Sequence, residues 1–136
     1  MRISPVAMDQ IRAHAESGYP FEICGIMIAA QEQGVVTTTE PVRNTVVDRA
    51  RDRYEMDPVD QIRVQRRCDA ERTSIIGYYH SHPDHPAWAS LTDAERAWKG
   101  PVYLIVSCAQ GRVVDANAFI AVADGGPMEQ TELIVE

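Results

Sequence analysis

Apolar residues follow a helical period in two parts of the chain, and each part begins with a capping residue and a proline. Ser4-Pro5 is typical of a helix start, and the spacing after it predicts a helix over 5–17. Asp57-Pro58 is the same kind of start and predicts a helix that runs to about residue 70. A third, shorter helix is predicted to begin at 90–93 and to end before Gly100-Pro101.

Between these helices, apolar runs rich in β-branched and aromatic residues predict strands. The predicted strands cover 21–30, 35–42, 73–80, 102–108, 112–122 and 129–135. Residues 43–56 are polar and charged, with only an isolated extended piece at 53–56. Gly125-Gly126 lies between two predicted strands, so we interpret it as a hairpin turn and not as a processed diglycine tail. The pattern predicts an α/β or α+β domain with an antiparallel or mixed sheet flanked by helices.

Length and composition narrow the class of protein. With 136 residues and 45% hydrophobic content, the chain is expected to form a single domain over 1–136. No apolar run approaches the roughly 18 residues of a membrane helix, and the N-terminus lacks the apolar core of a secretory signal. We therefore expect a cytoplasmic protein without a membrane span. Three cysteines without CxxC spacing argue against a disulfide framework, and a net charge of −7 argues against nucleic-acid binding.

The segment His80-Ser81-His82-Pro83 is followed at a fixed distance by Ser90 and Asp93. Residues two apart on a strand point to the same side, so His80 and His82 can present both rings to one ion. Asp93, in the first turn of the next helix, can supply a third ligand. Two imidazoles and one carboxylate, with a fourth position left for water, are typical of a catalytic zinc site. An alternative is that the histidines are surface residues and Asp93 only caps a helix.

Glu22 is the candidate general base. It is a carboxylate inside an apolar run, where a charge is costly unless something holds it. The alternative is a solvated residue at the entrance of a strand. Ser90 is a candidate donor to the oxygen of a reacting carbonyl, or only a helix cap. Cys24 is interpreted as a small buried hydrophobe, and His85 as a loop or substrate-side residue and not a fourth ligand.

These residues carry a resemblance to a known family. The positions Glu22, His80, His82, Pro83, Ser90 and Asp93 resemble the JAMM motif of MPN-domain (Mov34/PAD-1) zinc metalloproteases. The segment from Tyr19 to Gly25 is similar to the P-x-E-x-C-G segment of the compact bacterial and archaeal branch, and the strand from Tyr103 to Ser107 is also similar. The resemblance covers 4–122, nearly the whole chain.

The resemblance implies a cytidine-deaminase-like fold in which His80, His82 and Asp93 bind one Zn²⁺ per chain. It implies Glu22 as general acid/base and Ser90 as the residue that stabilises the tetrahedral intermediate. The implied activity is hydrolysis of the peptide or isopeptide bond after the C-terminal Gly-Gly of a ubiquitin-like protein. The short segment after Trp98 resembles bacterial enzymes that act on ubiquitin-like sulfur carriers, so such a carrier is the expected partner. The sequence leaves a homodimer open.

Three other classes of protein share part of this pattern. A non-catalytic MPN scaffold that binds a protein partner is the main alternative, although such scaffolds usually lose a ligand or the glutamate, and here none is missing. A zinc nucleoside deaminase needs H-x-E and P-C-x-x-C segments, which the chain lacks. A phosphoesterase with His-x-His needs many more histidines than the four present.

Overall fold

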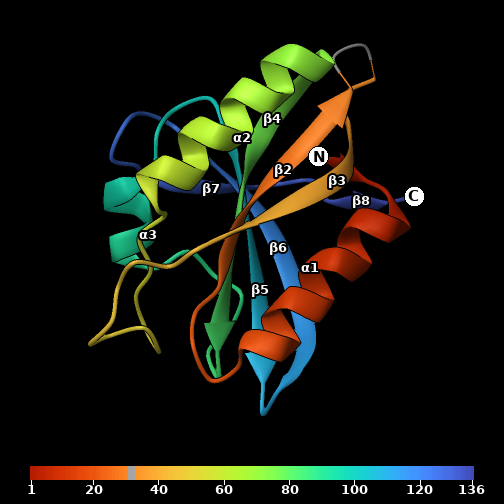
Figure 1. The fold of residues 1–136 in the computed structure, drawn as a ribbon. Coiled ribbons are helices and arrows are strands. Elements are labelled where there is room, and N and C mark those ends of the chain that lie inside the picture. Colours follow the sequence, from red (N-terminus) through yellow and green to blue (C-terminus); the bar gives the residue numbers. More distant parts are fainter. Residues whose placement is uncertain (31–32) are drawn as a thin grey trace.

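The protein is described by a computed structural model that covers residues 1–30 and 33–136 (Figure 1). Its elements are, in chain order, β1 (Arg2–Ile3), α1 (Pro5–Gly18), β2 (Cys24–Ala30), β3 (Val35–Val42), α2 (Pro58–Glu71), β4 (Thr73–Pro83), α3 (Leu91–Arg96), β5 (Val102–Ala109), β6 (Arg112–Ala121), β7 (Met128–Thr131) and β8 (Ile134–Val135). All these strands belong to one sheet, in the order β7-β6-β5-β4-β2-β3-β1-β8. The pairs β4–β5, β1–β3 and β1–β8 are parallel and the other neighbours are antiparallel, so the sheet is mixed, as predicted.

Helices α1 and α2 cover opposite faces of the sheet. Alternate residues of β2 face opposite sides. Met27 packs in the core beneath α1, with Ile11 and Leu104, whereas Ile26 packs in the core beneath α2, with Val64. Both long helices begin as predicted, because the side chains of Ser4 and Asp57 each accept a backbone N–H from the first turn. None of the helices in the described part of the chain is long and apolar enough to cross a membrane.

The strand that carries the histidines is longer than predicted. Strand β4 continues to Pro83 because parallel pairing with β5 extends through His82↔Ser107 and Pro83↔Cys108. The connection from β4 to β5 contains α3, and the first turn of α3 lies against the last residues of β4, where Asp93 contacts His80 and His82. Crevices at the carboxyl ends of parallel strands are frequent binding sites.

Two other boundaries differ from the prediction. The strand predicted over 21–30 begins at Cys24, since the backbone N–H of Glu22 bonds to the carbonyl of Ala50 and not to a neighbouring strand. The single strand predicted over 129–135 is two strands on opposite edges of the sheet. Strand β7 pairs with β6, and β8 pairs with β1. The period of the sequence cannot show this division, because both pieces are extended and only their partners differ.

Candidate metal centre

The rings of His80 and His82 converge at the end of β4. Their Nε2 atoms are 3.2 Å apart. His80 is fully buried, and the side chain of His82 is only 11% exposed. The spacing of two residues along the strand therefore brings the rings together, as the alternation of side chains predicts.

Asp93 completes this cluster from the first turn of α3. Its Oδ1 lies 3.2 Å from Nε2 of His80, and its Oδ2 lies 3.1 Å from Nε2 of His82. Ser90 fixes the position of Asp93 through a reciprocal cap. The Ser90 Oγ accepts from the Asp93 N–H at 3.0 Å, and the Ser90 N–H donates to Asp93 Oδ2 at 2.9 Å. Capping and clustering with the histidines are therefore compatible roles of one carboxylate.

The donor set fits a zinc ion. Tetrahedral zinc with ligands at 2.0–2.1 Å separates them by about 3.3 Å, close to the 3.1–3.2 Å between these nitrogen and oxygen atoms. The Nδ1 atom of His82 is 2.9 Å from the Pro86 carbonyl, which only accepts, so the hydrogen of the neutral ring lies on Nδ1. Its Nε2 is then an acceptor that faces the acceptor oxygen of Asp93. A cation between two such acceptors removes the conflict.

Glu22 lies beside this cluster, just before β2. Its exposed fraction is 5%, and its Oε2 has no hydrogen-bond partner among the described residues. One carboxylate oxygen of Glu22 lies within 4.8 Å of ring nitrogens of His80 and His82. Burial raises the pKa of Glu22 to about 8, and repulsion from Asp93 and Asp52 adds to this. Glu22 is thus at a strand entrance but not solvated. Since Asp93 lies closer to both rings, it fits a ligand better than Glu22 does.

Burial and hydrogen bonding act in opposite directions on the clustered groups. Burial lowers the pKa of His80. Burial also lowers the pKa of His82, but its hydrogen bonds to Asp93 and Pro86 outweigh this and raise it. For Asp93, burial favours the neutral acid, yet hydrogen bonds from His80 and from the protonated His82 ring, whose two nitrogens then both donate, hold its pKa far below the usual range. The aspartate is therefore ionised and able to bind a cation.

Tyr54 is a site residue that sequence reasoning missed. Its ring stacks on His80, with centroids 4.5 Å apart and planes at 26°. The Nδ1 atom of His80 is buried and has no hydrogen-bond partner in the described part of the chain. Metal-binding histidines usually donate this second N–H, which fixes the ring. Here the aromatic contact holds the ring instead. The extended piece at 53–56 was visible in the sequence, but nothing there indicated its partner.

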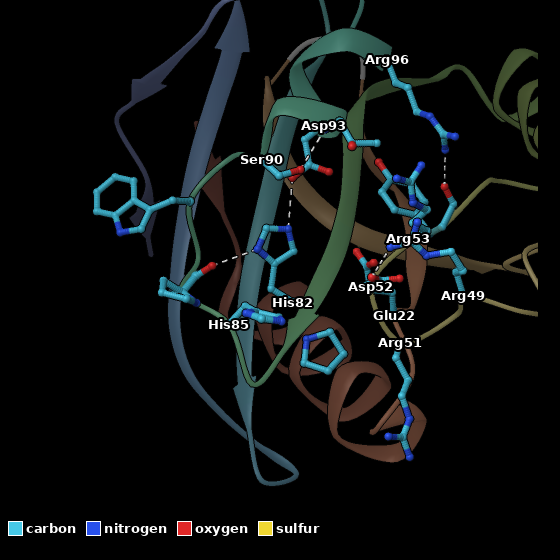
Figure 2. A pocket seen from close by; sticks show the side chains of 15 residues that line it. Glu22, Arg49, Arg51, Asp52, Arg53, His82, His85, Ser90, Asp93 and Arg96 are labelled. Atoms are coloured by element: carbon cyan, nitrogen blue, oxygen red, sulfur yellow. Dashed lines mark hydrogen bonds and ion pairs between the residues drawn. The ribbon is translucent and has the colours of Figure 1, made fainter.

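A cavity of about 420 Å³ opens in front of the cluster (Figure 2). Residues from three regions line it: Glu22 before β2, the segment Arg49–Tyr54, and the stretch from His82 to Arg96. His85 and Trp88 line it from the loop after β4, and Ser90 lies beside Asp93. Cys24 is instead fully buried in the core beneath α2, in agreement with its interpretation as a small hydrophobe.

A comparison with known families supports the motif. The family described as prokaryotic homologs of the JAB domain matches residues 4–119. The chain belongs to this family. It is 37% identical over 106 residues to the desampylase of Haloferax volcanii, which covers 74% of this chain and 76% of that one. It is 28% identical over 126 residues to the CysO-cysteine peptidase of Mycobacterium tuberculosis, with 91% and 84% covered.

The fold agrees with this membership. A JAB1/MPN domain protein from Archaeoglobus fulgidus superposes with a TM-score of 0.63 at 18% identity, and the match covers 100% of this chain and 97% of that one. The prediction of an MPN domain, with a mixed sheet flanked by helices, is confirmed. The family and its relatives also confirm that the protein is a hydrolase of the JAMM type.

Proposed function

We propose that the protein is a zinc-dependent peptidase or isopeptidase that hydrolyses the amide bond after the C-terminal Gly-Gly of a ubiquitin-like sulfur-carrier protein. Membership of the JAB family and relatives named as a desampylase and a CysO-cysteine peptidase support this substrate class. One observation carries the catalytic part of the proposal. A buried carboxylate of Glu22, whose Oε2 has no hydrogen-bond partner among the described residues, lies beside two histidines and an aspartate that fit one zinc ion.

In this proposal His80, His82 and Asp93 hold the ion, one per chain. A zinc ion so bound lowers the pKa of water and polarises a carbonyl oxygen. Glu22 accepts a proton from the attacking water and delivers it to the leaving amine. Of the carboxylates of residues 1–30 and 33–136 that line this cavity, it is the one that neither caps α3 nor forms an ion pair. The low polarity around Glu22 favours its protonated form, so the proton can stay on Glu22 after water attacks and before the amine leaves.

Ser90 stabilises the charge that develops on the carbonyl oxygen. Its Oγ already accepts the Asp93 N–H, so the hydroxyl hydrogen remains free to be donated into the cavity. A donor of this kind contributes most when charge accumulates in the transition state. The same contact ties Ser90 to Asp93, so the oxygen donor and the ligand move together.

The proposal is tested with zinc-loaded protein and a ubiquitin-like domain whose Gly-Gly is followed by a C-terminal extension. We expect about one zinc per chain, release of the extension in mass spectrometry, and loss of release with a chelator. Glu22→Gln is expected to retain zinc and to cleave about 10²- to 10⁴-fold more slowly. Retained cleavage in Glu22→Gln would refute the assigned base. Full zinc loading without cleavage of any Gly-Gly fusion would favour a non-catalytic MPN scaffold that binds a partner.

A further inference from the structure

The cavity in front of the metal centre is rich in arginine, although the chain as a whole is acidic. The net charge is −7, with 13 basic and 20 acidic residues. Four of the basic residues line this one cavity: Arg49, Arg51, Arg53 and Arg96. Figure 2 shows three of them on the segment beside Glu22, while Arg96 approaches from α3. A local positive charge on an acidic protein points to an anionic partner.

The arginine segment is fixed against the catalytic carboxylate. The Glu22 N–H donates to the Ala50 carbonyl at 2.5 Å. The Asn44 Nδ2 atom donates to the carbonyls of both Glu22 and Arg53, each at 3.1 Å. The backbone at Ala50 and at Arg53 is therefore held beside Glu22, and the arginines of this segment line the same cavity.

Most of this charge is not neutralised by the protein. Arg49 is paired with Asp52 at 2.6 Å. Arg51, Arg53 and Arg96 have no carboxylate within ion-pair distance among residues 1–30 and 33–136. Arg96 donates one hydrogen bond, to the Tyr54 carbonyl at 2.8 Å, and so keeps donors for another partner. We call Arg51, Arg53 and Arg96 the arginine patch.

The acidic residues in the cavity leave the arginine patch uncompensated. Asp52 is taken by Arg49, and Asp93 contacts the two histidines. Glu22, the third acidic residue that lines the cavity, has no arginine within ion-pair distance in the described part of the chain. The planar guanidinium fork matches a carboxylate and repels the ammonium group of lysine. In a substrate that is a polypeptide, the anion that such a fork recognises is a carboxylate.

We propose that the arginine patch selects substrates that carry a carboxylate within a few residues of the scissile bond. This rests on the proposed function, since it takes the cavity as the place of hydrolysis. The carboxylate has two sources in a Gly-Gly adduct: the free carboxylate of the leaving group, or an acidic side chain in the carrier tail before Gly-Gly. In either case a conjugate with a neutral tail and an amidated or lysine-linked leaving group is disfavoured.

Four fusions of a ubiquitin-like domain test this. Each has one residue after Gly-Gly, with its carboxylate free or amidated, and the residue before Gly-Gly is Glu or Gln. We measure kcat/KM for the zinc-loaded wild type, Arg53→Gln and the matched control Arg66→Gln. Arg66 is an exposed arginine of α2 that lies outside the cavity.

We expect the wild type to prefer a carboxylate-bearing fusion by about tenfold, as for a partly exposed charge-assisted contact. Arg53→Gln removes the preference, and Arg66→Gln keeps it. If amidation alone removes the preference, the leaving group is the source; if Glu-to-Gln exchange alone does so, the carrier tail is. Equal kcat/KM for all four fusions, or an equal loss on all four in Arg53→Gln, overturns the proposal.

A binding measurement distinguishes the proposed selection by the arginine patch from the proposed hydrolysis. The same fusions are titrated against zinc-loaded Glu22→Gln protein by fluorescence anisotropy, with Arg53→Gln added in the same background. A charge preference that depends on Arg53, without cleavage by the wild type, supports the arginine patch and refutes the proposed hydrolysis of Gly-Gly conjugates. Equal binding of all four fusions, or binding of none, overturns the arginine patch.

Discussion

The stacking of Tyr54 on His80 shows how one aromatic side chain replaces a missing hydrogen bond. His82 has its second nitrogen fixed by the Pro86 carbonyl, but Nδ1 of His80 has no such partner among the described residues. The Tyr54 ring lies against His80 over its face and is supported by the core beneath α2. The orientation of a proposed zinc ligand therefore depends on a residue from the segment that the sequence shows only as polar.

Removal of the Tyr54 ring is expected to weaken zinc binding. Tyr54→Leu leaves His80 free to rotate, and the loss of a contact that orients a ligand typically lowers metal affinity 10- to 100-fold, so we expect a change of about that size. Tyr54→Phe keeps the stacking and serves as the matched control. Competition with a chromophoric chelator measures the affinity. Equal affinities of the Leu and Phe variants would show that stacking does not orient the ring.

The two roles of Ser90 can be separated by substitution. Ser90→Ala removes both the cap and the hydroxyl, with about 1 kcal/mol of stability expected to be lost from the cap. Ser90→Gly also lacks the hydroxyl but costs only about a few tenths of that as a cap. If the hydroxyl stabilises the transition state, both variants lower kcat by about 10²- to 10³-fold. Thermal unfolding reports the cap and kinetics report the donor. A kcat that falls only in the alanine variant would indicate a cap and nothing more.

At the scale of elements, the convergence of the candidate ligands was predictable because each depends on local pattern. The spacing of His80 and His82 along one strand, and the cap formed by Ser90 with Asp93, are readable from neighbouring residues. The position of Glu22, in contrast, depends on its bond to Ala50, and the roles of Tyr54 and the arginine patch depend on where the segment 43–57 folds. Such contacts join residues far apart in the sequence, and the spacing of apolar residues along the chain does not predict them.

Gly25 is a second case in which a contact between residues far apart in the sequence decides what a position tolerates. A Cβ atom at Gly25 would lie 2.2 Å from the ring of Tyr79, which crosses β2 at that point. We predict that Gly25→Ala lowers the free energy of unfolding by about 1–3 kcal/mol or more, because a rigid ring and a strand must separate. Urea unfolding measures the loss. The double variant with Tyr79→Leu should recover part of it, and strictly additive losses would contradict the contact.

At the scale of the whole molecule, the two faces of the sheet carry different groups of polar residues. Beneath α2 and α3 lie the candidate zinc ligands. Beneath α1 the contact between Nδ1 of His14 and the Tyr79 hydroxyl, at 2.7 Å, involves no residue that lines the cavity. Since Tyr79 and His80 are adjacent on β4, one strand serves both faces, and stability and metal binding can be perturbed separately.

The His14 contact predicts a pH dependence of stability. Burial lowers the pKa of folded His14 below its ordinary value of 6.5, so the unfolded chain binds the proton first. Stability from this group is complete above pH 6.5 and falls as the pH decreases toward the folded pKa. We expect the free energy of unfolding to decrease more between pH 7.5 and 5.5 (roughly one unit either side of that value) in the wild type than in His14→Gln. Urea titrations at fixed zinc would show it, and parallel curves would exclude the contribution.

Asp93 closes the ring of proposed zinc ligands and also starts α3, and these two duties share one side chain. The carboxylate proposed to bind the ion therefore also caps the helix in the crossover from β4 to β5. A chain in which this crossover has not formed has only the two imidazoles to offer. Tight zinc binding is therefore expected only after the crossover from β4 to β5 has folded.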